Sequence, residues 1–93
     1  SAASTTALAA AEQAIPMWEE AILGLYAEWE EEQPEATEKQ LSVYEKEYEE
    51  KKTELEKKHG SGSAKMLREL AYWLEDVCVD LCFDLHTAEG NGD

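Results

Sequence analysis

Two cysteines, an aspartate and a histidine near the C-terminus come nearest to a metal site in residue type and spacing. Cys78 and Cys82 are four residues apart, and Asp84 and His86 follow them. Zinc sites need three or four ligands that converge tetrahedrally. Only the two thiols, at i and i+4, are convincing ligands here, so we interpret both cysteines as small buried hydrophobic side chains. We therefore expect neither a metal nor any other cofactor.

Three aspartates, Asp76, Asp80 and Asp84, recur every four residues and so lie along one edge of a helix. Such a ladder could receive Arg or Lys side chains from a partner, but a solvated helix edge has the same pattern. The solvated edge is the simpler interpretation. Like charges at this spacing cost roughly 0.2–0.5 kcal/mol per pair, which hints that something offsets them.

No catalytic motif accompanies these residues. The sequence lacks a glycine-rich phosphate loop, a nucleophile elbow and an HExxH motif. We predict no catalytic residues and no enzymatic activity.

The acidic composition of the chain disfavours some classes of binding partner. The chain has 93 residues, enough for one small domain, and its net charge is −14, from 22 acidic and 8 basic residues. This balance disfavours direct binding to nucleic acid or to an anionic membrane. No run of 18 apolar residues could span a bilayer. Two cysteines without a disulfide pattern fit a reducing compartment, so we expect an intracellular protein of the nucleus or cytoplasm.

Apolar spacing predicts a helical hairpin over residues 13–59, preceded by a flexible tail over residues 1–12. A first helix is expected over residues 16–32, because Pro16 suits a first helical turn, and Pro34 then interrupts it. A second helix follows over residues 35–59, with a narrow apolar stripe and charged flanks. The inward residues are Trp18, Ile22, Leu25 and Trp29 in the first helix, and Leu41, Tyr44, Tyr48 and Leu55 in the second.

A third helix is predicted over residues 64–88, followed by a disordered tail over residues 89–93. Its main stripe follows heptad spacing and comprises Leu67, Leu70, Leu74, Val77, Leu81 and Leu85. A second apolar strip, formed by Tyr72, Val79 and Phe83, lies about 120–160° around the same helix. A helix that is apolar on two sides is expected to be covered from more than one direction.

Gly-Ser-Gly-Ser at residues 60–63 separates the second and third helices. Gly60 suits a helix stop and Ser63 suits an N-cap, as in a natural loop. Composition changes across it, however, since every aspartate comes after this stretch and most lysines come before it. We therefore favour an engineered linker that joins two segments or replaces a longer loop.

These patterns together predict an all-α, three-helix bundle in which the hairpin receives the third helix in its groove. The expected function is non-enzymatic assembly of the subunits of a larger intracellular complex, with the inward residues of all three helices as the interface. The strip of Tyr72, Val79 and Phe83 predicts a two-fold homodimer or the binding of a further subunit.

Two alternatives remain. One is an acidic binder or chaperone of basic proteins such as histones, which salt would weaken far more than it weakens an apolar interface. The other is a wholly designed bundle, against which the cysteines and the mid-helix Gly24 argue.

Overall fold

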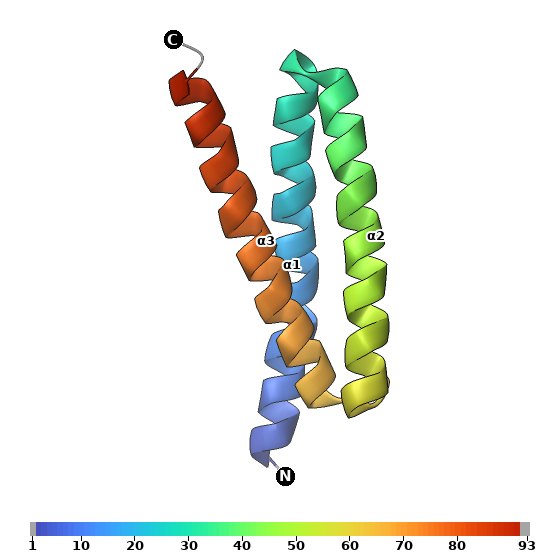
Figure 1. Cartoon of the computed structure of the whole chain (residues 1–93). Coiled ribbons are helices and arrows are strands. Elements are labelled where there is room, and N and C mark those ends of the chain that lie inside the picture. Colours follow the sequence, from blue (N-terminus) through green and yellow to red (C-terminus); the bar gives the residue numbers. More distant parts are fainter. Residues whose placement is uncertain (1, 92–93) are drawn as a thin grey trace.

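Three α-helices make up the structure. In the computed structural model, α1 spans Ala2–Glu32, α2 spans Pro34–His59 and α3 spans Ala64–Asn91. The structure describes residues 2–91, and side chains for residue 6 and residues 8–84. The helix α2 runs antiparallel to the other two (Figure 1). Since every pair of helices is in contact, the predicted all-α three-helix arrangement is confirmed.

The first helix begins earlier than the sequence suggested. We expected a start at Pro16, but α1 begins at Ala2 and Pro16 lies inside it, so that prediction is wrong. Residues 7–14 are mostly alanine with leucine, glutamate and glutamine, which are strong helix formers. Proline removes the hydrogen bond to the carbonyl of Glu12, and water can replace it because Glu12 is exposed. The third helix also ends later than the sequence suggested, because α3 continues to Asn91 instead of residue 88.

A single residue connects α1 to α2. Gln33 donates its N–H to the carbonyl of Trp29 at 2.9 Å, and Pro34 begins α2. The carbonyl of Gln33 accepts the backbone N–H of Thr37 at 3.0 Å and its hydroxyl at 2.6 Å. Thr37 is only 1% exposed. This connection leaves little freedom in the angle of the hairpin.

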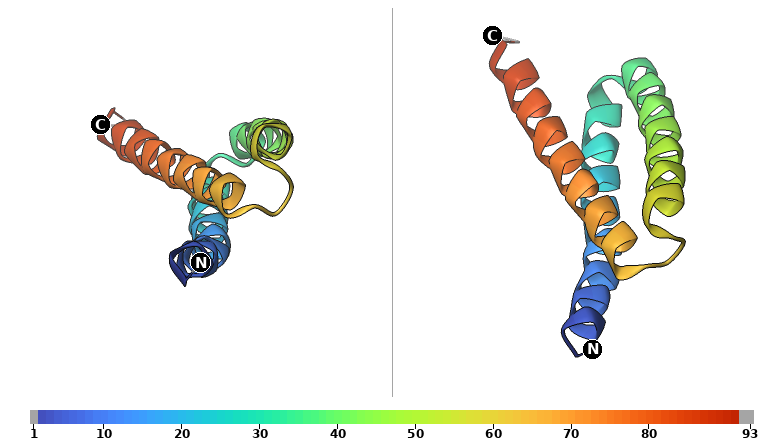
Figure 2. Two further views of the ribbon diagram at one scale, coloured as in Figure 1. Left: turned by 90° about the horizontal axis from the view of Figure 1, so that it is seen from below. Right: turned by 60° about the horizontal axis from the view of Figure 1, so that its bottom comes forward.

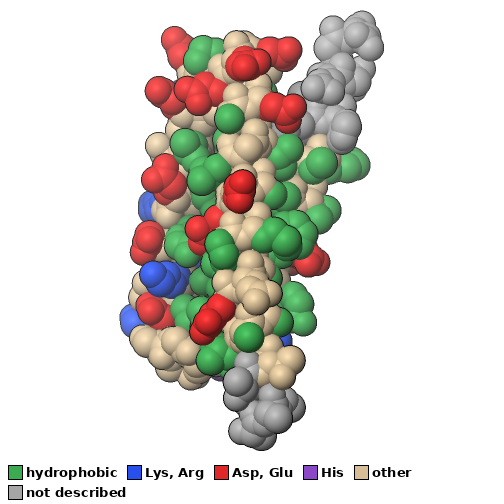
Figure 3. Space-filling model, turned by 180° about the vertical axis from the view of Figure 1, so that it is seen from behind, with side chains coloured by type: hydrophobic (Ala, Val, Ile, Leu, Met, Phe, Trp, Pro, Cys, Tyr) green, Lys and Arg blue, Asp and Glu red, His purple; other side chains and the backbone are tan. Residues whose placement is uncertain are grey.

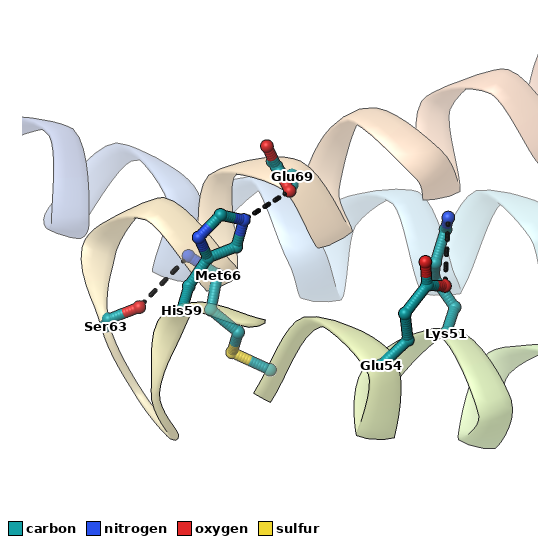
Figure 4. Close-up of polar contacts among 6 residues, drawn as sticks. All are labelled: Lys51, Glu54, His59, Ser63, Met66 and Glu69. Carbon is teal, nitrogen blue, oxygen red and sulfur yellow. Dashed lines mark hydrogen bonds and ion pairs between the residues drawn. The ribbon is translucent and has the colours of Figure 1, made fainter. Parts of the chain in front are cut away.

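The second connection, residues 60–63, is closed by capping bonds at both ends. The N–H of Gly60 bonds the carbonyl of Glu56, and Ser63 Oγ accepts the N–H of Met66 at 3.1 Å, as an N-cap does (Figure 4). Gly60 and Gly62 have φ values of 94° and 71°, which side-chain-bearing residues rarely adopt. The helix stop and the N-cap therefore form where the sequence placed them. Whether this stretch was engineered stays a prediction.

One polar contact bridges this connection. His59 Nε2 lies 2.9 Å from Glu69 Oε2, so the end of α2 is tied to the first turns of α3 (Figure 4). The hydrogen bond from His59 lowers the pKa of the Glu69 carboxyl. The contact fixes how closely α3 starts beside α2.

Packing along the molecule is uneven. The α3 helix lies mainly against α1, and it leans away from α2 towards its C-terminal end (Figures 1 and 2). The sequence placed α3 in the groove of the hairpin, and the structure sets it closer to α1 than to α2. The most deeply buried side chains come from all three helices, with three of the five in the N-terminal half of α3: Ile22, Thr37, Met66, Leu70 and Leu74.

Candidate interaction surfaces

Aromatic rings from all three helices meet in one cluster. Tyr26 of α1, Tyr44 and Tyr48 of α2, and Trp73 of α3 have neighbouring ring centroids 5.9–6.3 Å apart. The rings of Tyr44 and Trp73 are stacked, with an interplanar angle of 7°. Aromatic pairs at such distances contribute roughly 0.5–1.5 kcal/mol beyond the area they bury. We call these four residues the aromatic cluster.

The residues predicted to form the interface converge on the core. Leu85 is the exception, because its side chain lies outside the described part. The side chains of the others are buried or half-buried and pack together: Trp18, Ile22, Leu25, Trp29, Leu41, Tyr44, Tyr48, Leu55, Leu67, Leu70, Leu74, Val77 and Leu81. The structure joins them in one continuous core across α1, α2 and α3.

Sequence reasoning missed several core residues. Tyr26, which was not among the predicted inward residues, is 6% exposed, and Met66 is 2% exposed. Tyr26 follows Ile22 by four residues, so the helical period alone could have found it. Met66 precedes the heptad stripe by one residue, and its burial depends on the closeness of α3 to the capped loop. Trp73, also not among the predicted inward residues, stacks on Tyr44.

One buried polar atom in the core is unsatisfied. Trp29 Nε1, near the end of α1, has no hydrogen-bond partner among the described residues. A buried unpaired donor costs roughly 1–3 kcal/mol. This donor is therefore an unfavourable feature of the core near the end of α1.

The outer strip of α3, formed by Tyr72, Val79 and Phe83, faces away from the core. These side chains are 60%, 58% and 70% exposed, the three highest values among the large hydrophobic residues of the described part. Glu75, Asp76 and Asp80 lie between and beside them on the helix and are exposed. The strip is thus an apolar line with carboxylates along it.

The cysteines differ in their environments. Cys78 is half-buried at the edge of the core, and its pKa is raised by burial and then by the nearby Cys82 thiol. Cys82 is exposed, so the prediction that both are buried is wrong for Cys82. The adjacent Leu81 is buried, so Cys82 lies on the solvent side of α3 at this level.

Metal ligands do not gather in the described part of the chain, where no three His, Cys, Asp or Glu side chains lie close enough to hold an ion. The side chain of His86 lies outside that part. Exposed Asp76, Asp80 and Asp84 follow α3 as the sequence indicated.

A groove runs between α1 and α2. It has a volume of about 410 Å³. Apolar side chains and tyrosine rings form its walls, and three carboxylates stand among them: the lining residues are Glu19, Leu23, Leu41, Tyr44, Glu45, Tyr48 and Glu49. Tyr48 donates its O–H to Glu19 Oε1 at 3.0 Å across the groove.

Charge is distributed unevenly over the surface. Helix α1 contains no lysine or arginine, and six of the eight basic residues lie in α2. Figure 3 shows acidic side chains gathered at the end where α1 meets α2, and hydrophobic and acidic side chains interspersed along the junction of these helices. The strongest negative potential is therefore expected over α1 and the hairpin turn.

Comparisons with known proteins add no functional information. No model of a known protein family matches the chain, and searches of curated proteins and of solved structures gave no match. No helix of the described part is long and apolar enough to cross a membrane.

The aromatic cluster predicts a loss of stability at alkaline pH. Burial and, next, the charge of Glu19 raise the pKa of Tyr44 from 10.0 to about 12, and burial and the bond to Glu19 do the same for Tyr48. A raised pKa of a phenol favours its neutral form in the folded state. The stabilisation is complete below pH 10.0 and is lost as the pH rises to about 12.

Urea unfolding as a function of pH tests this, with Tyr48→Phe as the variant and Tyr72→Phe, outside the cluster, as the matched control. Tyr48→Phe should flatten the alkaline fall in the free energy of unfolding, and Tyr72→Phe should leave it unchanged. Equal profiles for the two variants would contradict the prediction.

Proposed function

We propose that this protein is a non-enzymatic interaction module in which the α1–α2 hairpin receives the amphipathic α3 and so assembles subunits of a larger intracellular complex. The observation that carries the proposal is the buried stripe of α3, where Leu70 and Leu74 are 2% and 0% exposed. These leucines anchor one helix in a surface made by two others, which is helix-in-groove recognition.

Burial supplies most of the energy of this contact. Each fully buried leucine contributes roughly 1.5–3 kcal/mol relative to exposure. The only ion pair between α3 and the hairpin in the described part is that of His59 with Glu69. An interface of this kind depends little on salt.

The loop supports the idea of a tether. Gly60, Ser61 and Gly62 are exposed, and no side chain of these three residues belongs to the core. A short flexible link raises the effective concentration of the two halves to the millimolar range. In this account the linker keeps α3 nearby, and the apolar stripe holds it.

The outer strip gives the module a second surface. A two-fold dimer would cover Tyr72, Val79 and Phe83 on both copies. It would also bring Glu75, Asp76 and Asp80 of the two copies together, and the net charge of −14 adds to the repulsion. Salt should therefore favour the dimer, whereas a basic partner would bind best at low salt.

An acidic binder of basic proteins is the second candidate function. The observation that favours it is the concentration of carboxylates over α1 and the hairpin turn, with no basic residue in α1. Binding through these groups would weaken steeply with ionic strength.

Cleavage of the connection tests the assembly proposal. A protease site placed within residues 60–63 should yield two fragments that still co-elute at micromolar concentration, because the apolar contact does not need the covalent link. Size-exclusion chromatography after cleavage gives the measurement, at low and high salt.

The matched variants are Leu74→Asp, which places a charge in the buried stripe, and Glu31→Gln, on exposed α1 surface. Leu74→Asp should separate the fragments, and Glu31→Gln should leave them together. Fragments of the unsubstituted protein that separate would show that the connection is an integral part of the fold.

Light scattering tests the outer strip. The intact chain should form a two-fold dimer at about 100 μM, more completely at high salt, and Tyr72→Lys with Phe83→Lys should return it to a monomer. A monomer at all salt concentrations would exclude the dimer, and the outer strip would then be the binding surface for another protein. A dimer that survives both lysines would place self-association elsewhere.

A further inference from the structure

The groove between α1 and α2 is a second concave surface, separate from the contact with α3. Leu23 on α1 and Leu41 on α2 provide apolar walls, and Leu23 remains 51% exposed. The Tyr44 ring also lines the groove, and it stacks on Trp73 of α3. The surface is preformed, because both helices also pack in the core.

The shape of the groove fits a helix. Its α2 wall comes from residues 41–49, a stretch of eight rises or about 12 Å along the axis. Within this wall, Leu41, Glu45 and Glu49 follow each other at four-residue spacing. A groove that runs for two turns between antiparallel helices accepts the side chains of a further helix, as in a four-helix bundle.

The charge of the groove selects its occupant. Glu19, Glu45 and Glu49 are at its edges, and neither Glu45 nor Glu49 has an ion-pair partner among the described residues. Lys52, the next basic residue on this side of α2, lies about one turn beyond Glu49 and forms no ion pair with it. A second copy of this chain would add negative charge.

We propose that the α1–α2 groove is the docking site for a basic amphipathic helix of another protein. The large apolar side chains of the docked helix lie over Leu23, Leu41 and Tyr44, and the Lys or Arg side chains of that helix pair with the three carboxylates. The O–H of Tyr48 holds Glu19 at the edge of the groove.

The lining residues of this site all come from the hairpin, and two of them, Tyr44 and Tyr48, also contact Trp73 of α3. The site differs from diffuse attraction to an acidic surface, because it requires apolar anchors and carboxylates at one place. Substitutions in the groove can therefore be compared with substitutions of equal charge elsewhere.

Fluorescence anisotropy of a labelled synthetic helix tests the proposal with the full chain. The probe has about 18 residues, with leucines on one stripe and lysines flanking it, and its control carries glutamates in place of the lysines. The lysine peptide should bind saturably at micromolar concentration, and the glutamate peptide should not bind. Glu45→Lys combined with Glu49→Lys, and separately Leu23→Asp, should each weaken binding by about 10-fold.

The matched control is Glu31→Lys combined with Glu32→Lys, which changes the net charge equally at the exposed end of α1. It should change the affinity by less than about 2-fold. An equal loss with both pairs would overturn the proposal in favour of diffuse attraction, as would the absence of saturable binding at about 1 mM. Association of the chain with itself that Leu23→Asp abolishes would assign the groove to a second copy. Unchanged helical circular dichroism in each variant excludes unfolding as the cause.

Discussion

Tyr44 lies between rings from both other helices, and the position of α2 depends on this contact. The other buried residues of α2, Thr37 and Leu55, are far apart along the helix. Leu41 and Tyr48 are half-buried, and most of the remaining residues are exposed and polar or charged. Helix α1, by contrast, packs along much of α3. The aromatic cluster is thus the central point at which α2 is held to a two-helix core, and the one-residue turn and the capped loop fix its ends.

The packing of α3 changes along its length. Beside the aromatic cluster Leu70 and Leu74 are buried, and farther along Leu81 is still buried while Cys82 is exposed. Two surfaces lie outside the core, the outer strip of α3 and the α1–α2 groove, and both combine apolar side chains with carboxylates. The proposed basic-helix site rests on this combination in the groove, whereas the proposed assembly module rests on the buried stripe of α3.

Periodicity predicted most of the fold, because apolar spacing reports directly which side of a helix is buried. The stripe of α3 and the face of α1 around Ile22 were predicted in this way. The helix stop at Gly60 and the N-cap at Ser63 were predicted from the residue types that end and begin helices. The early start of α1 was not, since Pro16 is a common first residue of a helix and only helix-forming alanines before it argued otherwise. The exposure of Cys82 and the groove itself depend on the angle between helices, which local sequence does not encode.

The most direct test of the role of the aromatic cluster is a double-mutant cycle between Tyr44→Leu and Trp73→Leu, with the free energy of unfolding measured by urea. These rings stack across α2 and α3 at a centroid distance of 6.2 Å. The account predicts a coupling energy of about 0.5–1.5 kcal/mol, because each substitution removes the partner of the other ring. Effects that add to within about 0.3 kcal/mol would contradict it, and α2 would then be held by its turns and its remaining apolar residues alone.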